Sequence, residues 1–288
     1  MTDSRPFGTY APTGFAQWAI DRTRRLPDHW ATRRMAHILR RLAIRALKGT
    51  PVDVEALGFR MRLYPYNNLC EKKVLFTPQF FDPEELAVLR SRMREDVVFI
   101  DVGASVGPYS LFVASLAGPN ARILSVEPQP DVFDRLTYNI RQNPFGTIKA
   151  VDCALADKAG ELTLFLDSRN KGESSVQIVG SGGAGSVRVP AVTLLELLKA
   201  EGFTRIDAIK LDVEGAEDLI LHPFFRDAPP SLYPALLIVE DERKQWQVDL
   251  PKLLEEKGYS LLMHTKSNFV YERPPGAPAA KGRPASAA

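Results

Sequence analysis

From residue 96 onward the chain alternates short apolar runs with amphipathic segments, which is the pattern of parallel strands buried on both faces and separated by helices. The apolar runs predict strands at Val97–Val102, Ala121–Val126, Ile148–Cys153, Ile206–Leu211 and Ala235–Val239. Helical spacing of apolar positions predicts helices at Tyr109–Leu116, Pro130–Gln142, Leu194–Ala200 and Pro251–Lys257. Two last runs predict an antiparallel pair at Tyr259–Met263 and Phe269–Tyr271. This alternation indicates an α/β fold for residues 96–272.

Upstream of this region the pattern is different. Residues 29–48 place apolar side chains near helical spacing and arginines around the rest of the surface, which predicts a basic amphipathic helix that ends before Thr50-Pro51. Residues 52–76 show short alternations of apolar and polar positions, which predict a small pair of strands. A further helix is predicted to begin near Asp82-Pro83.

A polar insertion interrupts the α/β alternation. Glu161–Leu166 and Val187–Val192 are predicted to be two strands that pair, and residues 168–186 between them are rich in Gly and Ser. Such a segment is too polar for a core and is a candidate loop or lid. Residues 273–288, rich in Pro, Ala and Gly, have the composition of a disordered tail.

Composition narrows the class of protein. The chain has 288 residues, of which 45% are hydrophobic, enough for one large domain with a sizeable core. No apolar run approaches the roughly 20 residues of a spanning helix, and the N-terminus lacks the pattern of a secretion signal, so we expect a cytoplasmic protein. The two cysteines, Cys70 and Cys153, argue against a disulfide framework or a zinc site.

Charge is distributed unevenly along the chain. Residues 1–50 contain ten Lys or Arg and three Asp or Glu, whereas residues 51–95 contain seven of each sign. We therefore expect a basic helical extension at 1–50, a strand pair and helix at 51–95, a main domain at 96–272 and a tail at 273–288. The basic helix has two interpretations. It contacts an anionic membrane surface, which would place the protein peripherally at the inner side of a membrane, or it packs on the main domain with its arginines in solvent.

The first strand of the main domain ends in a turn suited to a ligand. Asp101 stands at the carboxyl end of the strand, and the turn that opens the next helix contains Gly103, Ala104 and Gly107, where glycine lets the backbone approach a ligand. Glu127 ends the next strand, where an acidic side chain accepts hydrogen bonds from both hydroxyls of a ribose. The turn lacks the G-x-G-x-x-G of dinucleotide sites, and its carboxylate repels phosphate and suits an amino group. S-adenosylmethionine, which has a ribose, an ammonium and no phosphate, fits best.

A second group of charged residues follows a later strand. Within the segment from Lys210 to Glu217, K-L-D-V-E-G-A-E, strand geometry puts Lys210, Asp212 and Glu214 on the same side. Three charges at the end of a central strand are costly to bury without a function. The alternative is that Lys210 only neutralises the acids in a network at the rim of the sheet.

Together these motifs resemble the FkbM family of class I, S-adenosylmethionine-dependent methyltransferases. The resemblance extends from about Val52 to Tyr271, and its most specific part is the segment from Lys210 to Glu217. Its other elements are the D-V-G-A-x-x-G turn, Glu127-Pro128, Asn139, Ala154-Leu155-Ala156-Asp157, Ser174-Ser175 and Glu240. The sequence departs from the family at Ser105, where Asn is frequent, and at His222, near a common Gly. The resemblance implies a Rossmann-like sheet of seven strands, parallel except for one strand of the terminal hairpin, with the cofactor over the carboxyl ends of the strands.

The resemblance also implies an enzyme, and we expect a methyltransferase that methylates a hydroxyl of a sugar, a glycan or a natural product. A hydroxyl is a poor nucleophile until its proton is removed, so a general base is needed. Asp212 is the first candidate for this base, Glu214 and Glu240 are alternates, and Lys210 is expected to orient the carboxylate or the acceptor. Aromatic side chains that are either core residues or stacking surfaces for a ring-shaped acceptor are Tyr64, Tyr66, Phe80, Phe81 and Tyr109.

Other interpretations of the site stay open. Asp212 and Glu240 are also candidate ligands of a hard divalent cation such as Mg²⁺. Adenine is expected near residues 152–157, where Asp152 or Asp157 accepts from its amino group, and Asp157 also suits a turn cap. Alternative functions are N- or C-methylation of a small molecule, or a non-catalytic module that binds an adenosyl ligand or a membrane surface. Nucleic acid is disfavoured because the basic residues cluster in the N-terminal helix and no N-P-P-[YFW] motif is present, and the oligomeric state is open.

Overall fold

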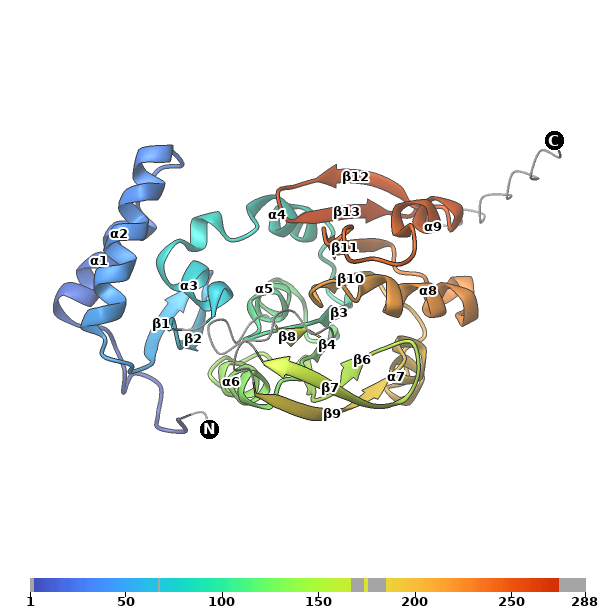
Figure 1. Ribbon diagram of the computed structural model, residues 1–288, viewed down its shortest axis with the longest axis horizontal. Helices are drawn as coiled ribbons and strands as arrows, with labels where there is room; N and C mark the ends of the chain where they lie inside the picture. The colour runs from blue at the N-terminus through green and yellow to red at the C-terminus, as the bar shows by residue number, and fades with distance from the viewer. Residues whose placement is uncertain (1–2, 67, 167–173, 176–184, 275–288) are drawn as a thin grey trace.

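Figure 1 shows the computed structural model of the chain, which describes residues 3–66, 68–166, 174–175 and 185–274. Its central sheet has seven strands in the order β12-β13-β11-β10-β3-β4-β5. Their bounds are Val98–Val102 for β3, Arg122–Val126 for β4, Ile148–Val151 for β5, Ala208–Leu211 for β10, Leu236–Glu240 for β11, Ser260–His264 for β12 and Asn268–Glu272 for β13. Neighbouring strands pair in parallel except at β13, which is antiparallel to β11 and β12. The expected Rossmann-like sheet with one antiparallel strand is confirmed.

Helices cover both faces of this sheet, because successive side chains of each strand point to opposite sides. Phe99 of β3 belongs to one apolar core, whereas its neighbour Ile100 belongs to the other. The first core is closed by α4 (Pro83–Ser91), α5 (Pro108–Leu116) and α6 (Pro130–Arg141). The second is closed by α7 (Leu194–Ala200), α8 (Glu217–Asp227) and α9 (Leu250–Glu256), with the 3-10 turn η2 (Pro230–Leu232) after α8. The predicted strands and helices of the main domain are confirmed to within two residues at each end.

A smaller sheet carries the polar insertion. It has the order β6-β9-β7-β8, with bounds Ala154–Leu155 for β6, Gly160–Leu166 for β7, Ser174–Ser175 for β8 and Ser186–Val192 for β9. Because β7 and β9 are antiparallel, the predicted pairing of these two strands is confirmed. Most of the predicted loop or lid, residues 167–173 and 176–184, lies outside the described residues, as do residues 275–288 of the predicted tail.

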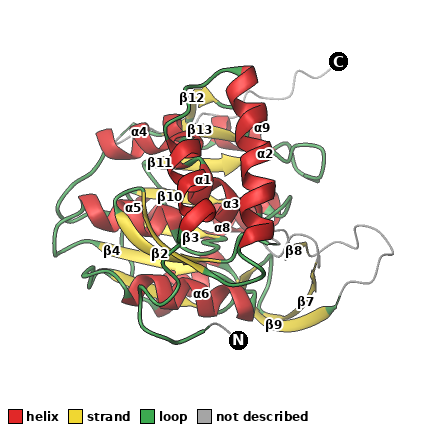
Figure 2. Cartoon of the chain, turned by 90° about the vertical axis from the view of Figure 1, so that its left-hand side faces the viewer, coloured by secondary structure: helices red, strands yellow, loops and turns green. Residues whose placement is uncertain are grey.

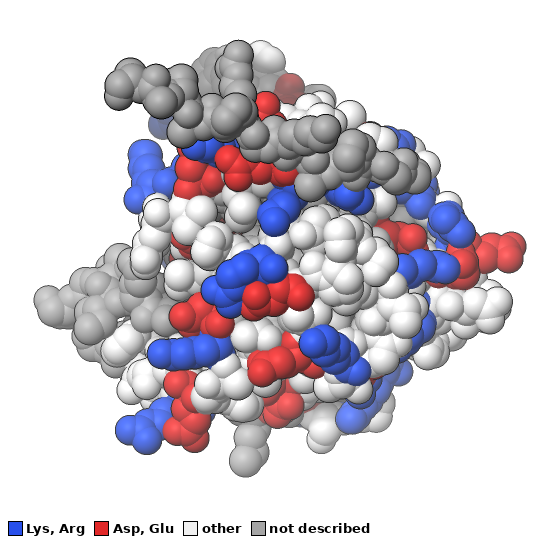
Figure 3. All heavy atoms as spheres, turned by 90° about the vertical axis from the view of Figure 1, so that its right-hand side faces the viewer, with Lys and Arg blue, Asp and Glu red and all other residues white. Residues whose placement is uncertain are grey.

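Two helices, α1 (Gly14–Arg24) and α2 (Trp30–Ala46), lie together at the end of the molecule remote from α8 and α9 (Figure 1). On the opposite side of the molecule from α1 and α2, acidic and basic side chains lie next to one another on the surface (Figure 3). The chain continues into a hairpin of β1 (Val52–Ala56) and β2 (Phe59–Leu63), then α3 (Leu69–Phe76) and the 3-10 turn η1 (Pro78–Phe80). In the part of the chain that the structure describes, no helix has the length and apolar character to cross a membrane.

The basic helix and the strand pair are confirmed, but the sequence analysis assigned neither α1 nor α3. For α3 the missed signal is Asn68, whose side chain accepts a hydrogen bond from the Glu71 amide at 2.9 Å and caps the helix. The first apolar core also contains Ile20 of α1, Ala43 of α2 and Met61 of β2. The core is therefore continuous across the expected domain boundaries at residues 50 and 95.

A buried ion pair ties the N-terminal segment to the hairpin. The side chain of Arg62 on β2 is fully buried and contacts Asp53 of β1 at 2.6 Å. The same guanidinium donates hydrogen bonds to the carbonyl oxygens of Asp3, Arg5 and Pro6. Residues 3–6 are therefore attached through their backbone to a charged group that has no access to solvent.

Candidate active site

A pocket of about 300 Å³ lies over the carboxyl ends of β3, β4, β10 and β11. The turns after these strands line it together with residues of α3, the segment before α4, β6 and β7. The candidate site residues that line it are Gly103, Ala104, Glu127, Lys210, Asp212, Glu214 and Glu240. The structure therefore brings the glycine turn and the later charged segment to one cavity.

Asp101 lies behind the pocket wall, beside Lys210 in the strand register. Its Oδ2 accepts hydrogen bonds from the Ser110 hydroxyl at 2.6 Å and the Ser110 amide at 3.1 Å, whereas its buried Oδ1 has no hydrogen-bond partner among the described residues. Burial raises the pKa of Asp101, and the Lys210 ammonium and the Ser110 hydrogen bonds oppose that rise. An unpartnered carboxylate oxygen beside the glycine turn suits the ammonium group of a ligand.

Glu127 ends β4 with its carboxylate in the pocket wall. One oxygen accepts from the Ser105 amide at 2.9 Å, and the other accepts from the Gln129 amide at 3.0 Å. Burial raises the pKa of Glu127 to about 7 in spite of these two donors. Each oxygen keeps further acceptor capacity, so the carboxylate suits a pair of neighbouring hydroxyl groups such as those of a ribose.

The turn between β3 and α5 depends on left-handed backbone. The amides of Gly103 and Ala104 both donate to the Val126 carbonyl oxygen at 3.0 Å, which fixes the turn against β4. The φ angle is +72° at Gly103 and +94° at Gly107, where a side chain is disfavoured. Ser105 has a φ of 50°, which explains why Asn, a residue that tolerates this conformation, suits the same position.

Lys210 and Asp212 form an ion pair in the pocket. The buried Lys210 Nζ donates to Asp212 Oδ2 at 2.8 Å, and the Asp212 side chain is 37% exposed. Burial opposes the charge on Lys210, but Asp212 and Asp101 outweigh it and raise the pKa of the ammonium. For Asp212, burial would raise the pKa, but Lys210 and a hydrogen bond with Glu240 hold it below its ordinary value. Both members of the pair are therefore charged at neutral pH.

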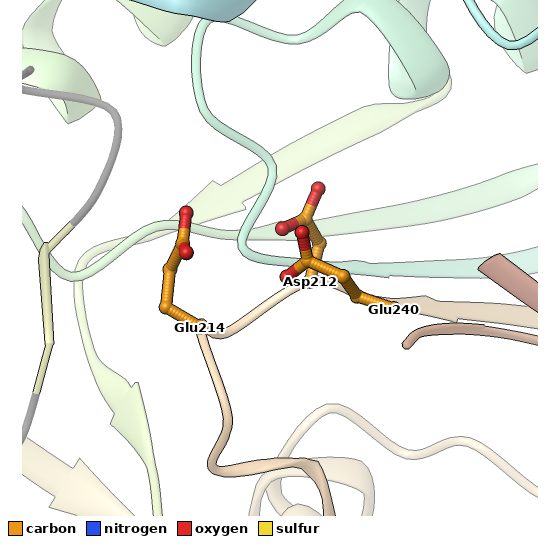
Figure 4. A group of neighbouring side chains, drawn as sticks. All are labelled: Asp212, Glu214 and Glu240. Atoms are coloured by element: carbon orange, nitrogen blue, oxygen red, sulfur yellow. The ribbon is translucent and has the colours of Figure 1, made fainter. Parts of the chain in front are cut away.

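Glu240 at the end of β11 and Glu214 after β10 complete a cluster of three carboxyl groups with Asp212 (Figure 4). One oxygen of each group lies within 4.8 Å of the others. Burial raises the pKa of Glu240, and the negative charges of Asp212 and Glu214 raise it further. The pKa of Glu240 is therefore raised above its ordinary value, whereas the pKa of Asp212 is lowered.

This cluster does not fit a divalent cation. Asp212 already contacts the Lys210 ammonium at 2.8 Å, so a protein cation already neutralises one of the three carboxyl groups. Hard cations require several oxygen ligands at once, with their charge available to the metal. The expectation of a bound Mg²⁺ is therefore not supported, and we derive no step through a metal ion.

The sequence analysis named only Phe81 in one wall of the pocket, as a core or stacking residue, and missed the other residues of that wall. It consists of residues from α3 and from the segment before α4: Leu69, Cys70, Lys73, Phe81 and Asp82. The Tyr109 hydroxyl donates to Asp82 Oδ2 at 3.0 Å, and Lys210 Nζ lies 4.9 Å from the centroid of the Tyr109 ring. The signal in the sequence was the aromatic pair of Phe81 and Tyr109, whose ring centroids are 5.7 Å apart.

Some candidates lie outside the pocket. Asp152 and Asp157 are exposed and do not line it, whereas residues 153–155 between them do. The assignment of one of these acids to adenine stays a prediction. The expected aromatic residues that do not line the pocket are Tyr64, Tyr66 and Phe80.

Both carboxylate oxygens of Glu217, the last acid of the charged segment, accept hydrogen bonds from the protein. One of its carboxylate oxygens accepts from the Val213 amide at 3.0 Å and from the Gly215 amide at 3.4 Å. The other accepts from Trp246 Nε1 at 2.8 Å. The side chain is buried, so it fixes the turn that carries the other acids instead of facing the pocket.

Comparison with known proteins now identifies the family, because the model of the methyltransferase FkbM domain matches residues 101–261. The chain belongs to the FkbM methyltransferase family. Methyltransferase sdnD of Sordaria araneosa is 28% identical over 248 residues, which cover 75% of this chain and 92% of that protein. Hexuronic acid methyltransferase AglP of Haloferax volcanii is 27% identical over 136 residues, which cover 47% of this chain and 53% of that protein. The solved structure of precorrin-6y C5,15-methyltransferase from Geobacter metallireducens superposes with a TM-score of 0.42 at 16% identity, covering 67% of this chain and 89% of that one.

Membership of the FkbM family implies S-adenosylmethionine as the methyl donor. The chemistry of the pocket fits this molecule at two points. Behind the pocket wall, Asp101 has a buried oxygen that no described residue hydrogen-bonds, which fits an ammonium, and Glu127 in the wall has further acceptor capacity, which fits a ribose. The cofactor expected from the turn between β3 and α5 is therefore compatible with the residues that surround it.

Proposed function

We propose that this FkbM methyltransferase transfers the methyl group of S-adenosylmethionine to a hydroxyl oxygen of a sugar, a glycan or a natural product. The observation that carries this proposal is the Asp212 carboxyl group, which contacts the buried Lys210 ammonium at 2.8 Å and lines the same pocket as Glu127. The named activity of AglP, methylation of a hexuronic acid, supports a hydroxylated sugar as the acceptor class.

The residues proposed to bind the methyl donor come from the turn between β3 and α5 and from the end of β4. S-adenosylmethionine, when bound, supplies a methyl group already activated on a sulfonium. Asp101 would pair with its ammonium group and Glu127 would accept hydrogen bonds from its ribose hydroxyls. The backbone of Gly103 and Ala104 lines the pocket and would approach the ligand, whereas Gly107 lies outside the pocket and its missing side chain leaves room for Leu136. Alignment of the reacting groups alone contributes roughly 7–11 kcal/mol to such a transfer.

The acceptor side depends on Asp212. Its carboxylate would take the proton of the acceptor hydroxyl as the oxygen forms its bond to the methyl carbon and the bond from that carbon to sulfur breaks. General base catalysis of this kind contributes on the order of 10²- to 10⁴-fold. Lys210 keeps Asp212 ionised and fixes its orientation through the 2.8 Å hydrogen bond. Glu240 ranks below Asp212 as the base because burial and the neighbouring acids raise its pKa, whereas Lys210 lowers the pKa of Asp212.

The test is a methyl-transfer assay with the full chain. Labelled S-adenosylmethionine is incubated with hexuronides, neutral glycosides and hydroxylated natural products, and the methylated atom is located by mass spectrometry and NMR. Methyl ether formation that is abolished by Asp212→Asn supports the proposal. Transfer to nitrogen or carbon, or to a carboxylate of the hexuronide as an ester, would contradict the assignment of a hydroxyl acceptor.

A further inference from the structure

The outer side of the N-terminal helix pair exposes large apolar side chains. On α1 the exposed fraction is 44% for Phe15 and 53% for Trp18, and on α2 it is 72% for Trp30, 55% for Ile38 and 44% for Leu42. We call these five residues, with Arg34, Arg41 and Arg45 of α2, the N-terminal face. Figure 2 shows α1 and α2 at the front of the molecule when this side faces the viewer.

The packing of α2 leaves this face without a partner inside the chain. Its fully buried residues are the small side chains Ala36 and Ala43, and α2 packs mainly on α1, which in turn contacts α3. The larger residues Trp30, Ile38 and Leu42 lie at spacings of eight and four, which place them on one side of the helix. Packing on the rest of the protein therefore explains the apolar residues on the inner side of α2. It does not explain the large apolar residues on the outer side.

The charges on α2 have a single sign, whereas α1 also carries the exposed acid Asp21. Residues 29–48 contain six Lys or Arg and no Asp or Glu. Arg33 pairs with Asp28 at 2.5 Å, whereas the structure records no acidic partner, within its described residues, for Arg34, Arg41 or Arg45. The opposite side of the molecule, by contrast, mixes both signs (Figure 3). Exposed aromatic rings among unpaired arginines are typical of helices that lie in the interface of an anionic bilayer.

We propose that the N-terminal face docks the protein on the surface of a bilayer that contains anionic phospholipids. Trp18 and Trp30 would lie at the level of the headgroups, where indole rings are favoured, and Ile38 and Leu42 would enter the acyl boundary. The arginines would contact lipid phosphates while their methylene stems stay on apolar surface. A second copy of the chain is a poorer occupant, since two such faces would bring their unpaired arginines together.

Docking would also place the pocket at a defined position relative to the bilayer surface. The helix α3 contacts α1, and it supplies Leu69, Cys70 and Lys73 to the pocket wall. Contacts from α2 through α1 to α3 would therefore connect the docked face to this wall of the pocket. This relationship is independent of which atom the enzyme methylates.

The test is cosedimentation of the full chain with vesicles of phosphatidylcholine, with and without phosphatidylglycerol, at low and at high salt. We expect binding only to the anionic vesicles and weaker binding at high salt. Arg34→Gln and Arg41→Gln together should lower the partition coefficient about 25-fold, since each basic residue near an anionic surface contributes about fivefold. Trp18→Ala with Trp30→Ala should lower it as well, because the interfacial rings are lost.

Matched controls come from the far end of the molecule. Leu261 and Leu262 of β12 are 51% and 43% exposed, so Leu261→Ser with Leu262→Ser removes comparable apolar surface and should leave vesicle binding unchanged. Circular dichroism and S-adenosylmethionine affinity should be unchanged in every variant. Equal binding to neutral vesicles, or full binding by the Arg34 and Arg41 variant, would overturn the proposal. A dimer in light scattering that the tryptophan substitutions abolish, without vesicle binding, would assign the face to a second copy.

Discussion

A Cβ atom on Gly103 would lie 1.9 Å from the main-chain carbonyl oxygen of Asp212. The turn after β3 and the turn after β10 are therefore in direct backbone contact, with no room for a side chain between them. One of these turns carries the proposed donor cradle and the other carries the proposed base. The two turns can pack this closely only because residue 103 is a glycine and has no Cβ atom.

This contact predicts a large stability effect at Gly103. We expect Gly103→Ala to lower the free energy of unfolding by about 2–5 kcal/mol, because it adds an overlap with backbone to a strained left-handed residue. Gly58 is the control: its φ of +95° is also left-handed, but a Cβ there would meet nothing within 4 Å. Gly58→Ala should cost only about 1–2 kcal/mol. Urea unfolding of both variants measures the difference, and equal losses would contradict the packing argument.

The raised pKa of Glu127 predicts a pH dependence of cofactor binding. Ribose hydroxyls donate to the ionised carboxylate, so binding competes with the protonation that occurs below about pH 7 in the free protein. We expect the affinity for S-adenosylmethionine to be constant above that pH and to fall toward tenfold for each pH unit well below it. Calorimetry across this range measures both the affinity and the proton released on binding.

Glu127→Gln separates this effect from other titrations. The variant keeps the shape of the side chain but has no proton to lose, so its affinity should be weaker at neutral pH and nearly independent of pH. A wild-type affinity that does not change on acidification would show that Glu127 does not contact the ligand in its ionised form.

The main domain was predictable because its strands and helices are specified locally. The buried strands are short apolar runs, and α7 begins with the capping box of Thr193 and Glu196 that its sequence indicates. The helix α3 was missed because its apolar and polar residues show little helical segregation and its main signal is the side chain of Asn68. For that reason the part of the pocket wall that α3 supplies, which contains Lys73, was also missed.

The charges of the candidate site could be listed from the sequence, but their states could not. Lys210, Asp212 and Glu240 follow their strands as expected, and the strand ends meet in the folded sheet. Which carboxyl group holds a proton depends on burial and on distances between segments far apart in the chain. Only the structure shows that Lys210 contacts Asp212 and that Glu240 lies close enough to these acids for their negative charges to raise its pKa.

Asp212→Asn is expected to separate binding from turnover. The amide cannot accept the acceptor proton, so kcat should fall on the order of 10²- to 10⁴-fold. The affinity for S-adenosylmethionine should change little, since the proposed ligands Asp101 and Glu127 are intact. Glu214→Gln on the same turn is the matched control and should reduce kcat far less. Single-turnover kinetics with calorimetry test both variants, and an unchanged kcat in Asp212→Asn would remove this residue as the base.

The buried pair of Arg62 and Asp53 predicts how firmly the N-terminal segment is held. Arg62→Met would leave the Asp53 carboxylate buried without its partner, so the free energy of unfolding should fall by about 3–5 kcal/mol. The same hairpin offers a control in Arg60, whose ion pair with Glu55 is exposed and 3.6 Å long, and Arg60→Met should cost at most about 1 kcal/mol. Arg62→Met should also speed proteolysis within residues 3–10, because the carbonyl oxygens that Arg62 binds lose their donor. If both variants unfold at the same urea concentration, the N-terminal segment is held by its other contacts and the buried pair contributes no more than a surface one.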